Sequence, residues 1–284
     1  MLTADLTGNF GNHMFQYAVT RACAENHGWE WGFNKNPTHD YFGGKEQMDF
    51  LDIDYGIPVQ GITQEYPEKI EYIDYGGEHL PICQHATWRG LQDNTKLVGG
   101  WQSEAYLNKD SCKQWFKMRR DTNLGTDENT CVINIRGGEY KYHPQLLLQK
   151  EYYRDCMNYM HELGVTDFLC ITDDVELAQT QLPPEIPCRH YSIEQDYYLI
   201  LQARYLILSN SSFAWFPAWM NERAVSIIAP MYWSRHNVSD GFWTPGNILV
   251  KDWNYMGRDG KSYNHFMCTD KLKQSKYEGL YENL

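Results

Sequence analysis

Apolar residues are spaced regularly in two regions of the chain. In the first, a short apolar segment at 2–6 runs into a glycine-containing turn. Apolar positions then recur every three or four residues from Met14 to Asn26. This pattern predicts a strand, a turn and a helix, with Gly28 as the helix terminator. Residues 29–33 could form the next strand, and the irregular stretch from about 34 to 94 predicts loops with short elements.

The second regular region begins near Cys131 and alternates apolar, β-branched runs with helical patterns. Such alternation predicts a parallel, doubly wound sheet, and therefore an α/β protein. We expect an acceptor-side domain at 1–128 and a ligand-binding domain at 129–284, with a C-terminal tail able to pack back on the first. The expected strands are 131–135, 168–171, 205–208 and 224–228, and the expected helices are 150–163, 175–182, 193–203 and 213–221.

Composition narrows the classes of function. The 284 residues include 37 Asp and Glu but only 25 Lys and Arg, and a net charge of −12 argues against a nucleic-acid partner. Aromatic residues make up 15% of the chain, and their flat faces suit sugar rings, although most will be core. Neither a signal peptide nor an apolar stretch of membrane-spanning length is present, so a soluble, cytoplasmic protein is expected. None of the eight cysteines forms a CxxC pair, which favours free buried thiols in a reducing compartment over a metal cluster.

Polar residues follow three of the predicted strands. They are Arg136, the pair Asp173 and Asp174, and Asn210 with Ser211 and Ser212. Ligands of doubly wound sheets bind outside the carboxyl ends of the strands, so these residues are expected on one rim. A guanidinium there can bind phosphate through two hydrogen bonds, and a helix N-terminus behind the serines favours an anion.

Each of these features also has an ordinary structural interpretation. Arg136 could be a surface residue in a turn. Asp173 and Asp174 could accept hydrogen bonds from ribose or a guanine edge, or could simply complement a helix dipole. Ser211 and Ser212 could be capping residues rather than a phosphate seat.

Two features of the first region are weaker signals. The turn at 8–12 lets a backbone approach a ligand closely, but it departs from the GxGxxG pattern of nicotinamide-binding proteins and could be only a tight turn. Asp52 and Asp54 have the spacing of a metal-binding pair, yet two exposed carboxylates on an alternating segment explain them better. No metal is expected.

Six segments together resemble motifs of the α-1,2-fucosyltransferase family. Residues 9–18 resemble its GLGNQMFQYA opening, which also has some likeness to protein O-fucosyltransferases. Residues 134–140 are similar to HxRRGDY, and residues 208–215 to IxSNSSFSW. The remaining segments, 99–106, 172–174 and 229–233, resemble GYFQSExY, SDD and APxxW.

This resemblance implies a GT-B-like architecture with two Rossmann-like domains and parallel sheets. It also implies an inverting fucosyltransferase that moves fucose from GDP-fucose to a glycan hydroxyl, without a metal or other cofactor. Arg136 would bind the β-phosphate, and Arg136, Asn12 and Glu139 are the catalytic candidates. Residues implied in donor binding are Gly11, Asn12, His13, Asn134, Arg136, Asp173, Asp174, Asn210, Ser211, Ser212 and Phe213.

The motifs are altered at four positions. Asn134, Gly137 and Glu139 stand where the family pattern has His, its second Arg and Asp, and His13 replaces a Gln. Loss of one of the two arginines removes a positive donor at the leaving group, which could lower activity or shift the donor preference. A transferase of another GDP-sugar, or a non-catalytic carbohydrate-binding protein, therefore stays open. The general base is also open, with candidates Glu139, His13 and Glu104.

Overall fold

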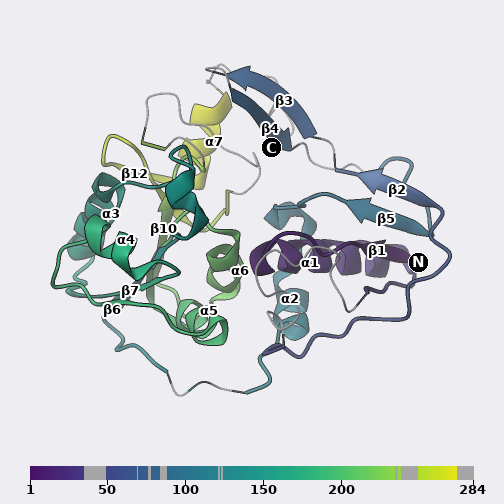
Figure 1. The fold of residues 1–284 in the computed structure, drawn as a ribbon, viewed down its shortest axis with the longest axis horizontal. Helices are drawn as coiled ribbons and strands as arrows, with labels where there is room; N and C mark the ends of the chain where they lie inside the picture. The colour runs from purple at the N-terminus through teal and green to yellow at the C-terminus, as the bar shows by residue number, and fades with distance from the viewer. Residues whose placement is uncertain are drawn as a thin grey trace. The chain divides into compact units, whose positions relative to one another are not determined.

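The protein is described by a computed structural model covering residues 1–34, 49–68, 70–75, 78–83, 88–120, 122, 124–233, 236–237 and 249–273. Two compact units are built on Met1–Asp121 and on Thr122–Thr244 with Leu249–Glu282 (Figure 1). The division falls slightly before the expected boundary at residue 128. The expected C-terminal tail after residue 273 lies outside the described residues.

Unit 1 contains a parallel three-stranded sheet in the order β1-β5-β2, formed by Leu2–Ala4, Thr95–Val98 and Gln64–Pro67. Helix α1, Phe10–His27, ends at Gly28, whose φ of 67° is the left-handed conformation that glycine adopts without strain. The predicted helix and its terminator are therefore confirmed. The described residues of the unit also form β3 (Ile70–Tyr75), β4 (Glu78–Cys83), η2 (Glu104–Tyr106) and α2 (Lys109–Trp115).

The strand expected at 29–33 is wrong. Trp31 pairs with Leu2 and Gly32 with Gly56, each as an isolated bridge. The Gly32 N–H still donates to the Leu2 carbonyl at 3.1 Å, but the next N–H, of Phe33, donates to the Tyr55 carbonyl at 2.9 Å. The pairing with β1 therefore stops after one bridge.

Unit 2 contains a seven-stranded sheet in the order β12-β11-β10-β9-β6-β7-β8. Every neighbouring pair is parallel except β11 and β12. The strands are β6 (Thr130–Ile135), β7 (Asp167–Thr172), β8 (Cys188–Arg189), β9 (Tyr205–Ile207), β10 (Ser226–Pro230), β11 (Asn254–Met256) and β12 (Ser262–Asn264). Its helices are α3 (Lys150–Glu162), α4 (Val175–Gln181), α5 (Ile193–Gln202), α6 (Ser212–Met220) and α7 (His265–Lys273), with the short η3 (Glu139–Tyr142).

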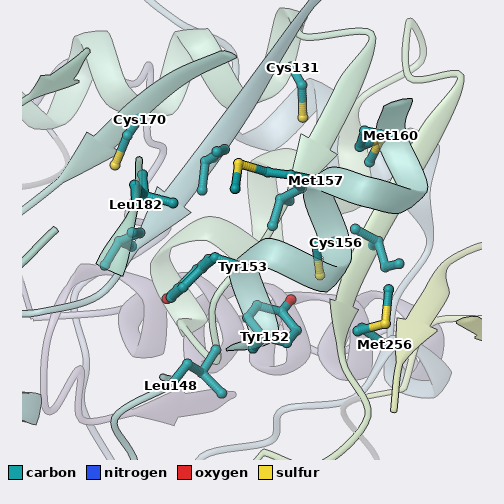
Figure 2. Close-up of a cluster of buried hydrophobic side chains, with 14 of the residues drawn as sticks. Cys131, Leu148, Tyr152, Tyr153, Cys156, Met157, Met160, Cys170, Leu182 and Met256 are labelled. Atoms are coloured by element: carbon teal, nitrogen blue, oxygen red, sulfur yellow. The ribbon is translucent and has the colours of Figure 1, made fainter. Parts of the chain in front are cut away.

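The core of unit 2 explains why these elements form. Five successive residues of β6 are buried, as expected for a strand covered on both faces. Figure 2 shows Tyr152, Tyr153, Cys156, Met157 and Met160 gathered along α3, with Cys131 and Cys170 on neighbouring strands. The predicted α/β class with parallel sheets is confirmed, and it is compatible with a two-domain, Rossmann-like GT-B fold.

The strand register brings the carboxyl ends of the central strands to a common edge. Ile133 lies opposite both Cys170 and Ile207, and Ile207 lies opposite Ile228. Pro230 in turn lies opposite Met256. The loops that leave β6, β7, β9, β10 and β11 therefore start along one rim of the sheet.

Two expectations about the chain's environment can be compared with the structure. The seven cysteines whose side chains the structure describes are free and buried, as the sequence predicted. Among the described helices, none has both the length and the apolar character needed to cross a membrane.

Candidate functional site

Arg136 is the first residue after β6, and its position is fixed from several sides. Its backbone N–H donates to Ser209 Oγ at 3.2 Å. Its guanidinium forms an ion pair with Asp173 and donates from Nη2 to Glu139 Oε1 at 3.1 Å. The Tyr140 ring centroid lies 5.6 Å from the guanidinium carbon. With 27% of its side chain exposed, Arg136 is a held cation at the rim of the sheet rather than a loose surface residue.

Asp173 fixes the position of Arg136 and of the loop that follows it. The Asp173 Oδ1 atom accepts hydrogen bonds from the backbone N–H groups of Gly137 and Gly138, at 2.7 and 3.2 Å. Its carboxylate thus fixes both the loop after β6 and the guanidinium. This geometry gives Asp173 a positioning role, while its expected contact with guanine or ribose stays a prediction.

Asp174 serves as the N-cap of α4. Its side chain accepts from the Leu177 N–H at 3.1 Å and pairs with Lys141 Nζ at 2.9 Å. The amide hydrogen bond, followed by the lysine, lowers the pKa of this carboxyl. Asp174 therefore acts as a helix cap in this structure.

Two amide side chains of the expected donor site form hydrogen bonds within the protein. Asn134 is buried, and its Oδ1 accepts from Ser209 Oγ at 2.9 Å. Asn210 is also buried and donates from Nδ2 to the carbonyls of Leu146 and Trp233, at 2.8 and 2.7 Å. These hydrogen bonds fix the loop after β9 to the end of β6 and to the segments at Leu146 and Trp233.

The N-terminus of α6 differs from that of α4. Its N-cap is Ser211, a buried residue whose side chain makes no capping hydrogen bond. Ser212 and Phe213 then form the first turn. The positive end of the helix dipole lies at this start, and a helix N-terminus of this kind favours an anion. Ordinary side-chain capping by Ser211 is not what the structure shows.

In unit 1, Gly11, Asn12 and His13 lie in the first turn of α1. Asn12 Oδ1 accepts from Gln102 Nε2 at 2.8 Å, so the 9–18 and 99–106 segments meet in space. Gln16 strengthens this junction, because its Nε2 donates to the Gly99 carbonyl at 3.1 Å. Burial lowers the pKa of His13. Of the other base candidates, Glu104 begins η2 and Glu139 begins η3.

The chain resembles a known glycosyltransferase. It is 24% identical, over 279 residues, to an alpha-1,2-colitosyltransferase of Escherichia coli, and the match covers 85% of this chain and 95% of that protein. No protein-family profile and no solved structure matches the chain. The likeness supports glycosyl transfer as the class of activity and a relationship to fucosyltransferase-like enzymes.

Three charged residues, Glu68, Asp196 and Arg258, have notable environments that the sequence alone did not indicate. In unit 1, the buried Glu68 follows β2 and accepts from the N–H groups of Gly100 and Trp101, at 2.7 and 2.9 Å. Burial raises the pKa of Glu68, while the two amide hydrogen bonds oppose that shift and fix the loop at 99–101. Glu68 lies in the irregular region, where the sequence offers no signal.

Unit 2 supplies the other two, Asp196 and Arg258. Asp196 is buried in the first turn of α5, and burial raises its pKa to about 7. The nearby charges of His190 and Asp173 act on it in opposite directions. Arg258 follows β11, a three-residue strand with no clear pattern in the sequence. The burial of Asp196 and the surroundings of Arg258 can be seen only in the folded structure.

Asp52 and Asp54 are both exposed, as expected for a solvent-facing pair. The Asp54 carboxylate accepts from the Gly56 N–H at 2.9 Å, which is a local turn contact. Within the described parts of the chain, no three His, Cys, Asp or Glu side chains gather into a potential metal site.

Proposed function

We propose that this protein transfers fucose from GDP-fucose to a hydroxyl group of a glycan acceptor, with inversion at the anomeric carbon and without a metal. The observation that carries the proposal is that Arg136 and the start of α6, whose N-cap Ser211 makes no side-chain capping bond, lie on one rim of the sheet. Both features favour a phosphate, and the backbone of Arg136 is hydrogen-bonded to Ser209, two residues before the N-cap.

The chemistry requires a positive charge that is already in place. As the glycosidic bond to the donor breaks, negative charge grows on the departing β-phosphate while the sugar becomes cation-like. A preorganised guanidinium stabilises that charge without reorganising during the reaction. Asp173 and Glu139 hold the Arg136 side chain from two directions, and the first turn of α6 would accept the second phosphate.

The acceptor hydroxyl must lose its proton as it attacks, and a positioned base would receive it. Glu139, His13 and Glu104 remain the candidates for that base. Glu139 Oε1 already accepts a hydrogen bond from Arg136, so in this geometry the carboxylate positions the guanidinium. Gly11, Asn12 and His13, in the first turn of α1, stay proposed as donor-binding residues.

The donor sugar has a specific second candidate. The E. coli relative is named for the transfer of colitose in an α-1,2 linkage. Colitose is therefore the second sugar to test, beside fucose and other sugars carried on GDP. A non-catalytic carbohydrate-binding protein is the alternative outside the enzymes.

The test combines nucleotide binding with turnover. GDP, but not UDP or ADP, should raise the melting temperature, because a ligand stabilises only the state it binds. Arg136→Ala should reduce nucleotide release from the donor by about 100-fold or more, whereas Arg204→Ala should leave it unchanged. Arg204 is the matched control because it pairs with the exposed Glu128, before the start of β9.

Each alternative outcome has a defined meaning. Preference for UDP would refute the GDP assignment, and near-normal turnover by a folded Arg136→Ala protein would refute the role of Arg136. Saccharide binding without release of nucleotide, across acceptor and donor panels, would favour the carbohydrate-binding alternative.

A further inference from the structure

Arg258 lies on the same rim as Arg136, although the two are far apart in the sequence. Strand β11 runs parallel to β10, with Met256 opposite Pro230, and ends where β10 ends. Arg258 follows in a tight turn that is closed by the Gly257 N–H donating to the Lys261 carbonyl at 2.8 Å. The fold therefore delivers a second arginine to the carboxyl edge of the sheet.

Among the described residues, no carboxylate forms an ion pair with Arg258. Its guanidinium carbon lies 4.2 Å from the Tyr232 ring centroid, and its Nη1 atom is buried without a hydrogen-bond partner in the described parts of the chain. The adjacent Asp259 carboxylate is engaged elsewhere, accepting from Tyr263 Oη at 2.7 Å. This contrasts with Arg136, which has two carboxylate partners. A buried donor that lacks an acceptor is costly, so the site favours an anionic ligand.

Contacts link Arg258 to the start of α6. Tyr232, on which the guanidinium stacks, precedes Trp233, and the Trp233 carbonyl accepts from Asn210 at 2.7 Å. Asn210 is the residue before the N-cap of α6. The Tyr232 N–H also bonds to Nδ1 of the buried His236 at 3.3 Å. Burial, with a contribution from Arg258, lowers the pKa of His236 to about 3, so no second positive charge competes there.

We propose that Arg258 is a second phosphate-binding cation of this site, donating to a diphosphate oxygen at the start of α6. The inference rests on the proposed function, because it assumes that the rim holds a nucleotide diphosphate. It adds a residue from the β11 end of the sheet to a site otherwise built from β6, β7 and β9. The residue after Arg136 is Gly137, so in this chain a second arginine comes from a distant segment instead.

Calorimetric titration of Arg258→Gln with GDP and with inorganic pyrophosphate tests this assignment. Loss of a charged hydrogen-bond donor should weaken both ligands by about 10- to 100-fold. Guanosine, followed by ligand-detected NMR, should bind as it does to the unaltered protein. Arg258→Lys should lose less affinity than Arg258→Gln, because it keeps the charge. Arg204→Gln, which removes an equal charge away from the rim, should bind all three ligands normally.

The outcomes separate this inference from the proposed function. Unchanged pyrophosphate and GDP affinity in a folded Arg258→Gln protein would overturn the role of Arg258 and leave the transferase proposal standing. If the protein prefers another nucleotide but Arg258→Gln still loses pyrophosphate binding, the guanine assignment fails while the role of Arg258 stands. An equal loss of guanosine binding would show that Arg258 only supports the structure, and would also overturn the inference.

Discussion

Gly137 shows how a single altered residue is accommodated by its surroundings. A Cβ atom at this position would lie 2.7 Å from Asp174 Cβ and 2.9 Å from Leu177 Cδ2. The N-terminus of α4 therefore occupies the space that any side chain would need. Glycine in place of arginine therefore removes one charge and also allows the loop to pack closely against the helix.

We expect Gly137→Arg to destabilise the protein by about 1–3 kcal/mol, since overpacking forces backbone shifts. It should not raise turnover, although it recreates the two adjacent arginines of the related motif. Chemical denaturation and donor turnover would measure both effects. Gly125→Arg is the matched control, because a Cβ at Gly125 meets nothing within 4 Å. A Gly137→Arg protein as stable as this control, with faster turnover, would contradict the packing argument.

At the residue scale, some of the site could be predicted from the sequence and some could not. Arg136 and Asp173 follow apolar strands, so their meeting at one rim follows from the rules of parallel sheets. Glu68, Asp196 and Arg258 are conspicuous because of burial or a missing partner. Those properties depend on packing between distant segments, which the sequence does not display.

At the scale of elements, the two helix starts beside the rim are built differently. Helix α4 is capped by the Asp174 carboxylate, whereas α6 receives no side-chain cap from Ser211. Both sequences, Asp-Asp and Ser-Ser, allowed either a cap or a ligand site. The structure gives α4 a side-chain cap, whereas the missing Ser211 cap at α6 is compatible with the proposed phosphate seat.

Asp174→Ala should therefore cost about 1 kcal/mol of stability, the typical loss for a removed N-cap. The affinity for GDP should change little, because the carboxylate already serves Leu177 and Lys141. Asp174→Asn should keep most of the stability, since asparagine also caps helices. Urea denaturation and calorimetric titration measure the two quantities. A large loss of GDP affinity in both variants would instead assign Asp174 to donor recognition.

Element prediction succeeded where a period or an apolar run was long enough to read. Helix α3, expected at 150–163, is observed at Lys150–Glu162, and β6 matches its expected core. The strands β8, β11 and β12 span two or three residues each. Their pairing depends on neighbours already in the sheet, so local pattern carries too little information to predict them.

At the scale of the whole molecule, the charge distribution sets a requirement for binding. The chain carries a net charge of −12, so it repels anions at long range. In the proposed site, Arg136, Arg258 and the first turn of α6 would supply a local attraction for a diphosphate. The effect of such a ligand should be confined to particular segments of the chain.

Hydrogen exchange followed by mass spectrometry can locate that effect. We expect GDP to slow exchange in peptides covering 136–141, 209–216 and 256–260, because ligand binding suppresses local opening. The proposed contacts of Gly11, Asn12 and His13 predict added protection at 8–13 as well. Peptides from β3 and β4 should not change. The Arg136→Ala protein is the control, and it should show little protection at the same GDP concentration. Protection confined to 8–13, or spread evenly through both units, would contradict a diphosphate held at the rim of unit 2.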